Sequence, residues 1–315
     1  MKMWAYNINL GYNMWFDKYS LLNFNEYDKI ERDFLYFEKD VWDRIIEFLP
    51  KQGINTVIID LAEGIKYDSC PELAVEGSLE KAEFKKMLDR IRELGMTPVP
   101  KLDFSAAHDI WLKHYSRMLT TTPYRELVKN LIDEVCELFD NPPNFHIGMG
   151  DESNEYLKHY GFIVTRGRIN FWEDVNIMLD ACRKNGARPM MSSEYYTREP
   201  YLFTKNISED VILTASYFGT ILPEMDEYGR DSRSQAQKQL EELQKNFKND
   251  IIYQGNGLTA FNLNALAEFG KNHPENFLGV MSSPEEPCVD RVDFVHMNDA
   301  YRLGLAKRNF FPEEE

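Results

Sequence analysis

The feature of this chain that most limits its fold is a regular alternation of short apolar segments with amphipathic segments. Alternating strands and helices are typical of a parallel α/β fold, and eight strands are the number that closes a barrel. No GxGxxG follows an early strand, so an open doubly wound sheet is the second choice. We therefore predict a (β/α)8 TIM barrel. The eight expected strands are Met3–Leu10, Asn55–Leu61, Thr97–Leu102, Asn144–Gly148, Arg188–Ser192, Val211–Ser216, Asp250–Gln254 and Phe277–Ser282.

The segments between these strands carry apolar residues every three or four positions, as amphipathic helices do. Gly53, Gly95 and Gly186 follow three of them and predict left-handed caps at the helix ends. No linker or change of composition interrupts the pattern, so we expect residues 1–315 to form one barrel domain. The expected helices are Asp40–Leu49, Lys81–Leu94, Tyr124–Phe139, Phe171–Asn185, Ser234–Phe247, Asn262–Asn272 and Asp290–Lys307.

Charge and cysteine content exclude several classes of protein. The net charge is -16, and no basic patch offsets it, which argues against nucleic acids and anionic membranes as partners. Four cysteines without a CxxC pair favour free thiols over a disulfide framework or a structural zinc site. No signal region or transmembrane run is present, so a native N-terminus would mean a cytoplasmic protein. We expect no cofactor and no metal, and the oligomeric state stays open.

Polar and aromatic residues follow the predicted strands at the barrel end where active sites are built. The segment Phe145–Glu152 runs from an apolar strand containing His146, through glycines, into the carboxylates Asp151 and Glu152. Carboxylates and aromatic rings together suit a neutral, polyhydroxylated ligand such as a sugar. The other candidate binding residues at strand ends are Asp103, His108, Glu194, Tyr217, Tyr253 and Glu285.

Two of these segments resemble one known family of enzymes. The run His146-Ile147-Gly148-Met149-Gly150-Asp151-Glu152 is similar to the strand-four motif H-I-G-G-D-E of glycoside hydrolase family 20, the β-N-acetylhexosaminidases. Val99–His108 is similar to their strand-three segment V-P-E-I-D-M-P-G-H. The chain has one more residue, Met149, between His146 and Asp151, and it has Lys101 where a glutamate is usual. The resemblance extends over Asp40–Glu152.

The resemblance implies a retaining, substrate-assisted glycoside hydrolase that acts on a carbohydrate. Glu152 would be the general acid and base, and Asp151 would stabilise the substrate's 2-acetamido group as it attacks the anomeric carbon. Tyr253 would bind the acetamide oxygen, and Asp103 and His108 would support the site. Adjacent carboxylates raise each other's pKa, which helps to keep Glu152 protonated.

Other functions remain open. Glu152 as the acid with Glu285 or Glu194 as a protein nucleophile would also give a retaining glycosidase, without the need for an acetamide. A non-catalytic sugar-binding barrel is a third possibility. A metal-dependent hydrolase in which Asp103, His108, His146 and Asp151 gather around the ion is weaker, because no HxH or HExxH spacing supports it. In every case the extra residue predicts an irregular backbone over Met149–Glu152.

Overall fold

Eight parallel strands form a closed barrel in the order β1 to β8, with β8 paired to β1. The computed structural model describes residues 2–18, 29–150, 152, 164–221, 228, 231, 233–259 and 261–314. The predicted barrel is confirmed, and every strand lies within one or two residues of its expected bounds. The strands are β1 (Met3–Asn9), β2 (Thr56–Asp60), β3 (Thr97–Lys101), β4 (Asn144–His146), β5 (Arg188–Ser192), β6 (Ile212–Ser216), β7 (Ile251–Gly255) and β8 (Phe277–Ser282).

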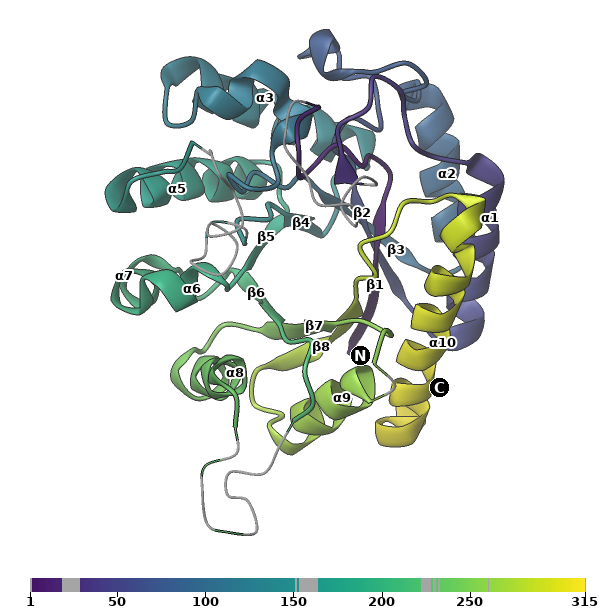
Figure 1. Ribbon diagram of the computed structural model, residues 1–315, viewed down its shortest axis with the longest axis vertical. Coiled ribbons are helices and arrows are strands. Elements are labelled where there is room, and N and C mark those ends of the chain that lie inside the picture. The colour runs from purple at the N-terminus through teal and green to yellow at the C-terminus, as the bar shows by residue number, and fades with distance from the viewer. Residues whose placement is uncertain are drawn as a thin grey trace.

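Helices surround the barrel (Figure 1). Gly53, Gly95 and Gly186 have φ of 76°, 80° and 76°, which confirms the three predicted left-handed caps. No helix in the described part of the chain is long and apolar enough to cross a bilayer. The described helices are α1 (Lys39–Phe48), α2 (Lys81–Glu93), α3 (Thr122–Leu138), α5 (Arg168–Lys184), α6 (Tyr195–Arg198), α7 (Pro200–Asn206), α8 (Gln235–Asn246), α9 (Asn262–Asn272) and α10 (Asp293–Phe310). Short 3-10 turns are η2 (Leu49–Gln52), η3 (Pro71–Leu73), η4 (Ile110–Arg117), η5 (Asp290–Val292) and η6 (Pro312–Glu314).

The buried apolar residues form two separate clusters. The larger contains residues of the helices and of the strand faces that pack against them. The smaller takes one residue from each of seven strands and fills the inside of the barrel. Because successive strand residues point to opposite faces, these seven positions define which residues point inward. They are Ala5, Ile58, Val99, Met190, Ile212, Ile252 and Met281.

Two residues further along each of these strands, the inward-facing position is polar in every case. We call these seven residues the polar ring: Asn7, Asp60, Lys101, Ser192, Thr214, Gln254 and Ser283. The barrel interior therefore changes from an apolar plug to a polar floor as it approaches the carboxyl ends of the strands. This change places polar groups at the end of the barrel where ligands bind in this fold.

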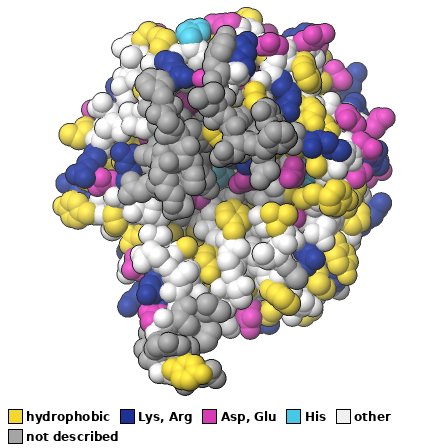
Figure 2. All heavy atoms as spheres, in the orientation of Figure 1, with side chains coloured by type: hydrophobic (Ala, Val, Ile, Leu, Met, Phe, Trp, Pro, Cys, Tyr) yellow, Lys and Arg dark blue, Asp and Glu magenta, His cyan; other side chains and the backbone are white. Residues whose placement is uncertain are grey.

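Side chains of both charges are distributed along the edge of the molecular face in Figure 2. Many form ion pairs on the surface, such as Arg44 with Asp290 at 2.8 Å and Arg183 with Asp210 at 2.8 Å. Exposed pairs of this kind contribute at most about 1 kcal/mol each, so they set solubility more than the fold.

Candidate functional site

A polar cavity opens at the carboxyl ends of the strands. Its free volume is about 50 Å³, room for one or two water molecules, so only a small group of a ligand can enter its deep end. We call it the strand-end cavity. Among its described lining residues, Trp15 has the one apolar side chain. These residues are Asn7, Asn9, Trp15, Asp60, Lys101, Asp103, His108, His146, Gly148, Gly150, Ser192, Glu194, Ser216, Gln254, Ser283 and Glu285.

Lys101 lies between two carboxylates on the floor of the cavity. Its Nζ is 2.7 Å from Asp60 Oδ2 and 3.2 Å from Asp103 Oδ2. Burial lowers the pKa of Lys101, but the two carboxylates outweigh this effect and hold the pKa well above its usual value. Burial also raises the pKa of Asp103, yet Lys101 and His108 bring it well below its usual range. The Lys101 ammonium and the Asp103 carboxylate are therefore both charged.

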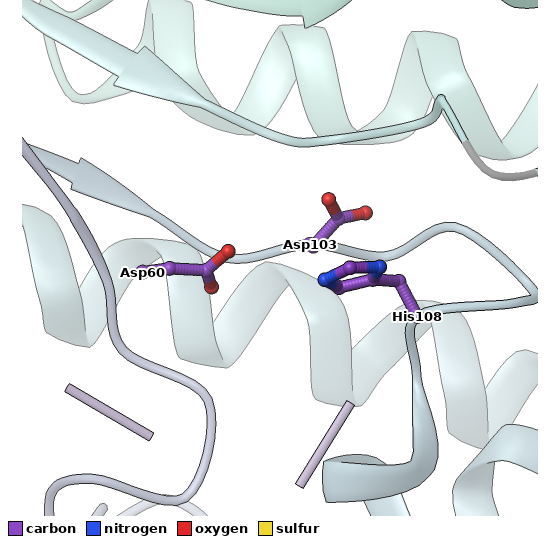
Figure 3. Close-up of side chains that lie close together, drawn as sticks. All are labelled: Asp60, Asp103 and His108. Atoms are coloured by element: carbon purple, nitrogen blue, oxygen red, sulfur yellow. The ribbon is translucent and has the colours of Figure 1, made fainter. Parts of the chain in front are cut away.

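Asp60, Asp103 and His108 are the cluster that most resembles a metal site in the described part of the chain. Their ligand atoms all lie within 4.8 Å of one another, and Figure 3 shows the three side chains gathered beside one another. Lys101 already places a positive charge within ion-pair distance of both carboxylates. A divalent cation would have to displace that ammonium, so these residues fit a metal poorly while Lys101 is charged.

The strand-four motif contributes its glycines to the cavity. A Cβ on Gly148 would lie 2.0 Å from Asp103 Oδ1, and one on Gly150 would lie 2.4 Å from Glu194 Oε2. Gly148 and Met149 have φ of 70° and 69°, both in the left-handed region. The predicted backbone irregularity is confirmed at Met149. Asp151 lies outside the described residues.

His146 supports the floor of the cavity as a neutral side chain. Its Nδ1 accepts a hydrogen bond from the Gly148 amide at 2.9 Å, and its Nε2 lies 3.0 Å from the Thr214 hydroxyl. Burial lowers the pKa of His146 to about 3, and the charge of Lys101 acts in the same direction. The imidazole therefore holds the Gly148 amide and the Thr214 hydroxyl in place and adds no charge near neutral pH.

Glu152 is fully buried and is not among the described residues that line the cavity. Its Oε1 contacts Arg166 and accepts a hydrogen bond from the Ala106 amide at 3.1 Å. Arg166 in turn contacts Asp174 at 2.9 Å and the Tyr124 hydroxyl at 2.6 Å. Burial raises the pKa of Glu152, and the Arg166 charge opposes that rise.

The two expected tyrosines point away from the cavity. The Tyr253 hydroxyl donates to Gln244 Oε1 on α8 at 2.6 Å, and the Tyr217 hydroxyl donates to the Thr220 carbonyl at 2.8 Å. Strand alternation explains both placements, because the neighbouring Ser216 and Gln254 are the residues that line the cavity. The structure thus places neither tyrosine where a bound sugar in the cavity would meet it.

Five of the predicted binding residues line the cavity, namely Asp103, His108, His146, Glu194 and Glu285. Glu285 has φ of 55° and its Oε2 lies 3.8 Å from the Lys29 amine. The ring of His108 stacks edge-on against Trp15, with ring centroids 4.8 Å apart.

Sequence reasoning did not select other lining residues, including Asn7, Asn9, Trp15, Asp60 and Gln254. Most of them could have been found from the alternation of inward-facing and outward-facing residues along each strand. Trp15 lies after β1 and has no such signal.

The sequence matches no protein-family model and no curated protein significantly. Solved structures are similar in fold. A pneumococcal exo-β-D-N-acetylglucosaminidase module superposes with a TM-score of 0.60 at 13% identity, covering 98% of this chain and 84% of the other. A β-N-acetylhexosaminidase from Bacteroides fragilis gives a TM-score of 0.60 at 14% identity, covering 98% of this chain and 70% of the other. A β-N-acetylhexosaminidase from Streptomyces plicatus gives a TM-score of 0.60 at 14% identity, covering 96% of this chain and 64% of the other. This chain therefore shares the barrel fold of glycoside hydrolase family 20 structures.

Proposed function

We propose that this chain is a hexosaminidase-like glycoside hydrolase whose substrate binds at the strand-end cavity. The observation that carries the proposal is the packing of the Asp103 and Glu194 carboxylates against Gly148 and Gly150 of the strand-four motif. The motif that resembles a hexosaminidase active site thus lies beside two cavity carboxylates. The fold shared with β-N-acetylhexosaminidases supports the same function.

The motif suggests a substrate-assisted mechanism. Glu152 would protonate the glycosidic oxygen and later activate water, and Asp151 would stabilise the 2-acetamido group during its attack. The raised pKa of Glu152 supports a role as proton donor. In this mechanism the Glu152 carboxyl has to leave Arg166 and turn toward the cavity when substrate binds.

The cavity lining favours a second mechanism with a protein nucleophile, because Glu194 and Glu285 line it. One of these carboxylates would attack the anomeric carbon while the bond to the leaving oxygen breaks and Glu152, as acid, gives that oxygen a proton. Water would then hydrolyse the glycosyl ester and return the carboxylate. This route requires no acetamide on the substrate.

A panel of aryl β-glycosides, with and without a 2-acetamido group, tests the proposal. Hydrolysis of the acetamido sugar alone selects substrate assistance, and hydrolysis of other hexosides selects the protein nucleophile. Measurable sugar binding without turnover of any substrate would identify a non-catalytic sugar-binding barrel and overturn the proposed activity.

A further inference from the structure

A second, larger cavity lies between α8 and α9, which Figure 1 shows on the outside of the barrel. Its free volume is about 640 Å³, within the usual range for small-molecule sites. Residues from 241–248 and from 269–276 line it, and β7 and β8 begin shortly after these two segments. We call this cavity the α8–α9 groove. It therefore lies at the opposite end of the barrel from the strand-end cavity.

Two phenylalanine rings form the apolar part of the groove floor. Phe247 and Phe269 are 8% and 7% exposed. Phe269 packs edge-on against Tyr253, with ring centroids 5.4 Å apart. The exposed ring of His273 lies 4.6 Å from the Phe269 ring and extends this aromatic surface toward the rim. Aromatic rings that are held in place in this way suit the C–H face of a sugar or another flat apolar group.

Asn276 supplies the floor with an unpaired hydrogen-bond acceptor. Its Nδ2 donates to the Phe247 carbonyl at 2.9 Å, which fixes the orientation of the amide, and its Oδ1 is buried without a partner. The other floor amide is fully engaged, because Gln244 accepts from the Tyr253 hydroxyl and donates to the His273 carbonyl. A buried acceptor without a donor costs free energy, so Asn276 favours a ligand that brings a hydroxyl or an N–H group.

The rim of the groove is polar, and its charges balance. It carries two carboxylates, Glu241 and Glu275, and two ammonium groups, Lys245 and Lys248. Lys245 and Glu275 form no ion pair or side-chain hydrogen bond within the described part of the chain. An ion gains little from a rim of balanced charge. Hydroxyl groups both donate and accept, so they can bond to ammonium and carboxylate side chains alike.

The groove between α1 and α2 provides a contrast. Its volume is about 350 Å³, and its charged residues include pairs such as Lys39 with Asp43 at 2.6 Å and Arg90 with Glu47 at 3.3 Å. None of its described lining residues has a buried polar atom without a partner. The unpaired groups are thus particular to the α8–α9 groove and are not shared by helix–helix grooves of this barrel in general.

We propose that the α8–α9 groove binds a neutral hexopyranose unit of a glycan. The sugar ring lies against Phe269 and His273, and one hydroxyl donates to Asn276 Oδ1. Other hydroxyls bond to Lys245 and Glu275 at the rim. A purely aromatic ligand would leave these rim side chains unused. This site goes beyond the proposed glycosidase function, because it holds its sugar whether or not the strand-end cavity is catalytic.

Amide NMR of the labelled protein tests this site, with S-linked tetrasaccharides of glucose and of N-acetylglucosamine, which resist hydrolysis. Saturable shifts of residues 245–248 and 273–276 with either tetrasaccharide are expected. His273→Ala should weaken this binding by about two- to tenfold, the range for one aromatic contact. Glu275→Ala should also weaken it. His114→Ala is the matched control and should change nothing, since His114 is an exposed ring stacked on Tyr115 outside the groove.

Shifts confined to the strand-end cavity, or unchanged affinity in both His273→Ala and Glu275→Ala, would overturn this site. Tighter binding of phenol than of the sugars at the same amides would assign the groove to aromatic molecules and would overturn it as well. Turnover separates the two proposals, because His273→Ala should hydrolyse aryl glycosides at the wild-type rate. Sugar binding in the groove of a protein without hydrolysis keeps this site and removes the glycosidase. Hydrolysis without groove binding does the reverse.

Discussion

Arg166 and Glu152 form an ion pair in which neither side chain reaches solvent. Arg166 also binds Asp174, and Asp174 binds Arg125 at 2.7 Å, so a chain of charges runs from the barrel to the surface of α3 and α5. Glu152 Oε2 has no hydrogen-bond partner. The residue that the motif suggests as the acid is therefore held in a buried network next to the cavity lining.

Removing Arg166 should strongly destabilise the protein. Arg166→Met leaves Glu152 buried without its cationic partner and leaves Asp174 with Arg125 alone, which costs about 3–5 kcal/mol. Urea unfolding followed by circular dichroism measures the loss. Glu173→Gln is the control, since it breaks an exposed pair with Arg125 worth at most about 1 kcal/mol. Equal losses in the two variants would show that the buried network does not hold the structure together.

Glu152→Gln separates a catalytic role from a structural one. If Glu152 is the acid, the variant keeps its fold and ligand affinity, and its turnover falls by roughly two to four orders of magnitude. Substrates with activated leaving groups should lose less, because they need less protonation. Full activity on an unactivated substrate would leave Glu152 with only its role as the partner of Arg166.

The close packing of Gly150 against Glu194 gives a test of the position of that carboxylate. Gly150→Ala would place a Cβ 2.4 Å from Glu194 Oε2 and force the side chain to move. We expect a loss of turnover of about tenfold or more with a small change in stability, since misplacement by about 1 Å can cost about a hundredfold. Gly167→Ala is the matched control, because nothing lies within 4 Å of its added Cβ. Unchanged turnover in Gly150→Ala would show that the position of Glu194 is unimportant.

Glu63 should make stability depend on pH. It is buried and accepts hydrogen bonds from the amides of Tyr12 and Asn13 at 2.8 and 3.1 Å. Burial raises its pKa from 4.5 to about 7. The folded state therefore keeps a proton that the unfolded state releases, and stability falls by up to roughly 3 kcal/mol as pH rises from about 4.5 to 7.

Denaturant titrations of the wild-type protein and Glu63→Gln across this pH range measure the effect. The variant should lose this part of the pH dependence while keeping an acceptor oxygen for Tyr12 and Asn13. The same slope in both proteins would rule out Glu63 as its source.

Strand periodicity was sufficient to predict the barrel, because buried parallel strands are short apolar runs separated by amphipathic helices. It also located Asp103, Glu194 and Glu285, which follow strand ends. Tyr253 and Tyr217 were chosen by residue type, although the inward positions of Ile252 and Ile212 put them on the opposite face. The contact between Glu152 and Arg166 depends on the path of the chain between β4 and α5, which sequence patterns do not encode.

The measurement that tests the account most directly is the hydrolysis of aryl β-hexosaminides by the wild-type protein and Glu194→Gln, with the anomeric product followed by NMR. The account predicts hydrolysis with retention by the wild-type protein and a rate at least about a hundredfold lower for the folded variant, because a cavity carboxylate acts on the substrate. Absence of hydrolysis by a wild-type protein that binds the sugars, or hydrolysis with inversion, would contradict it, and full activity of Glu194→Gln would exclude Glu194 as the nucleophile.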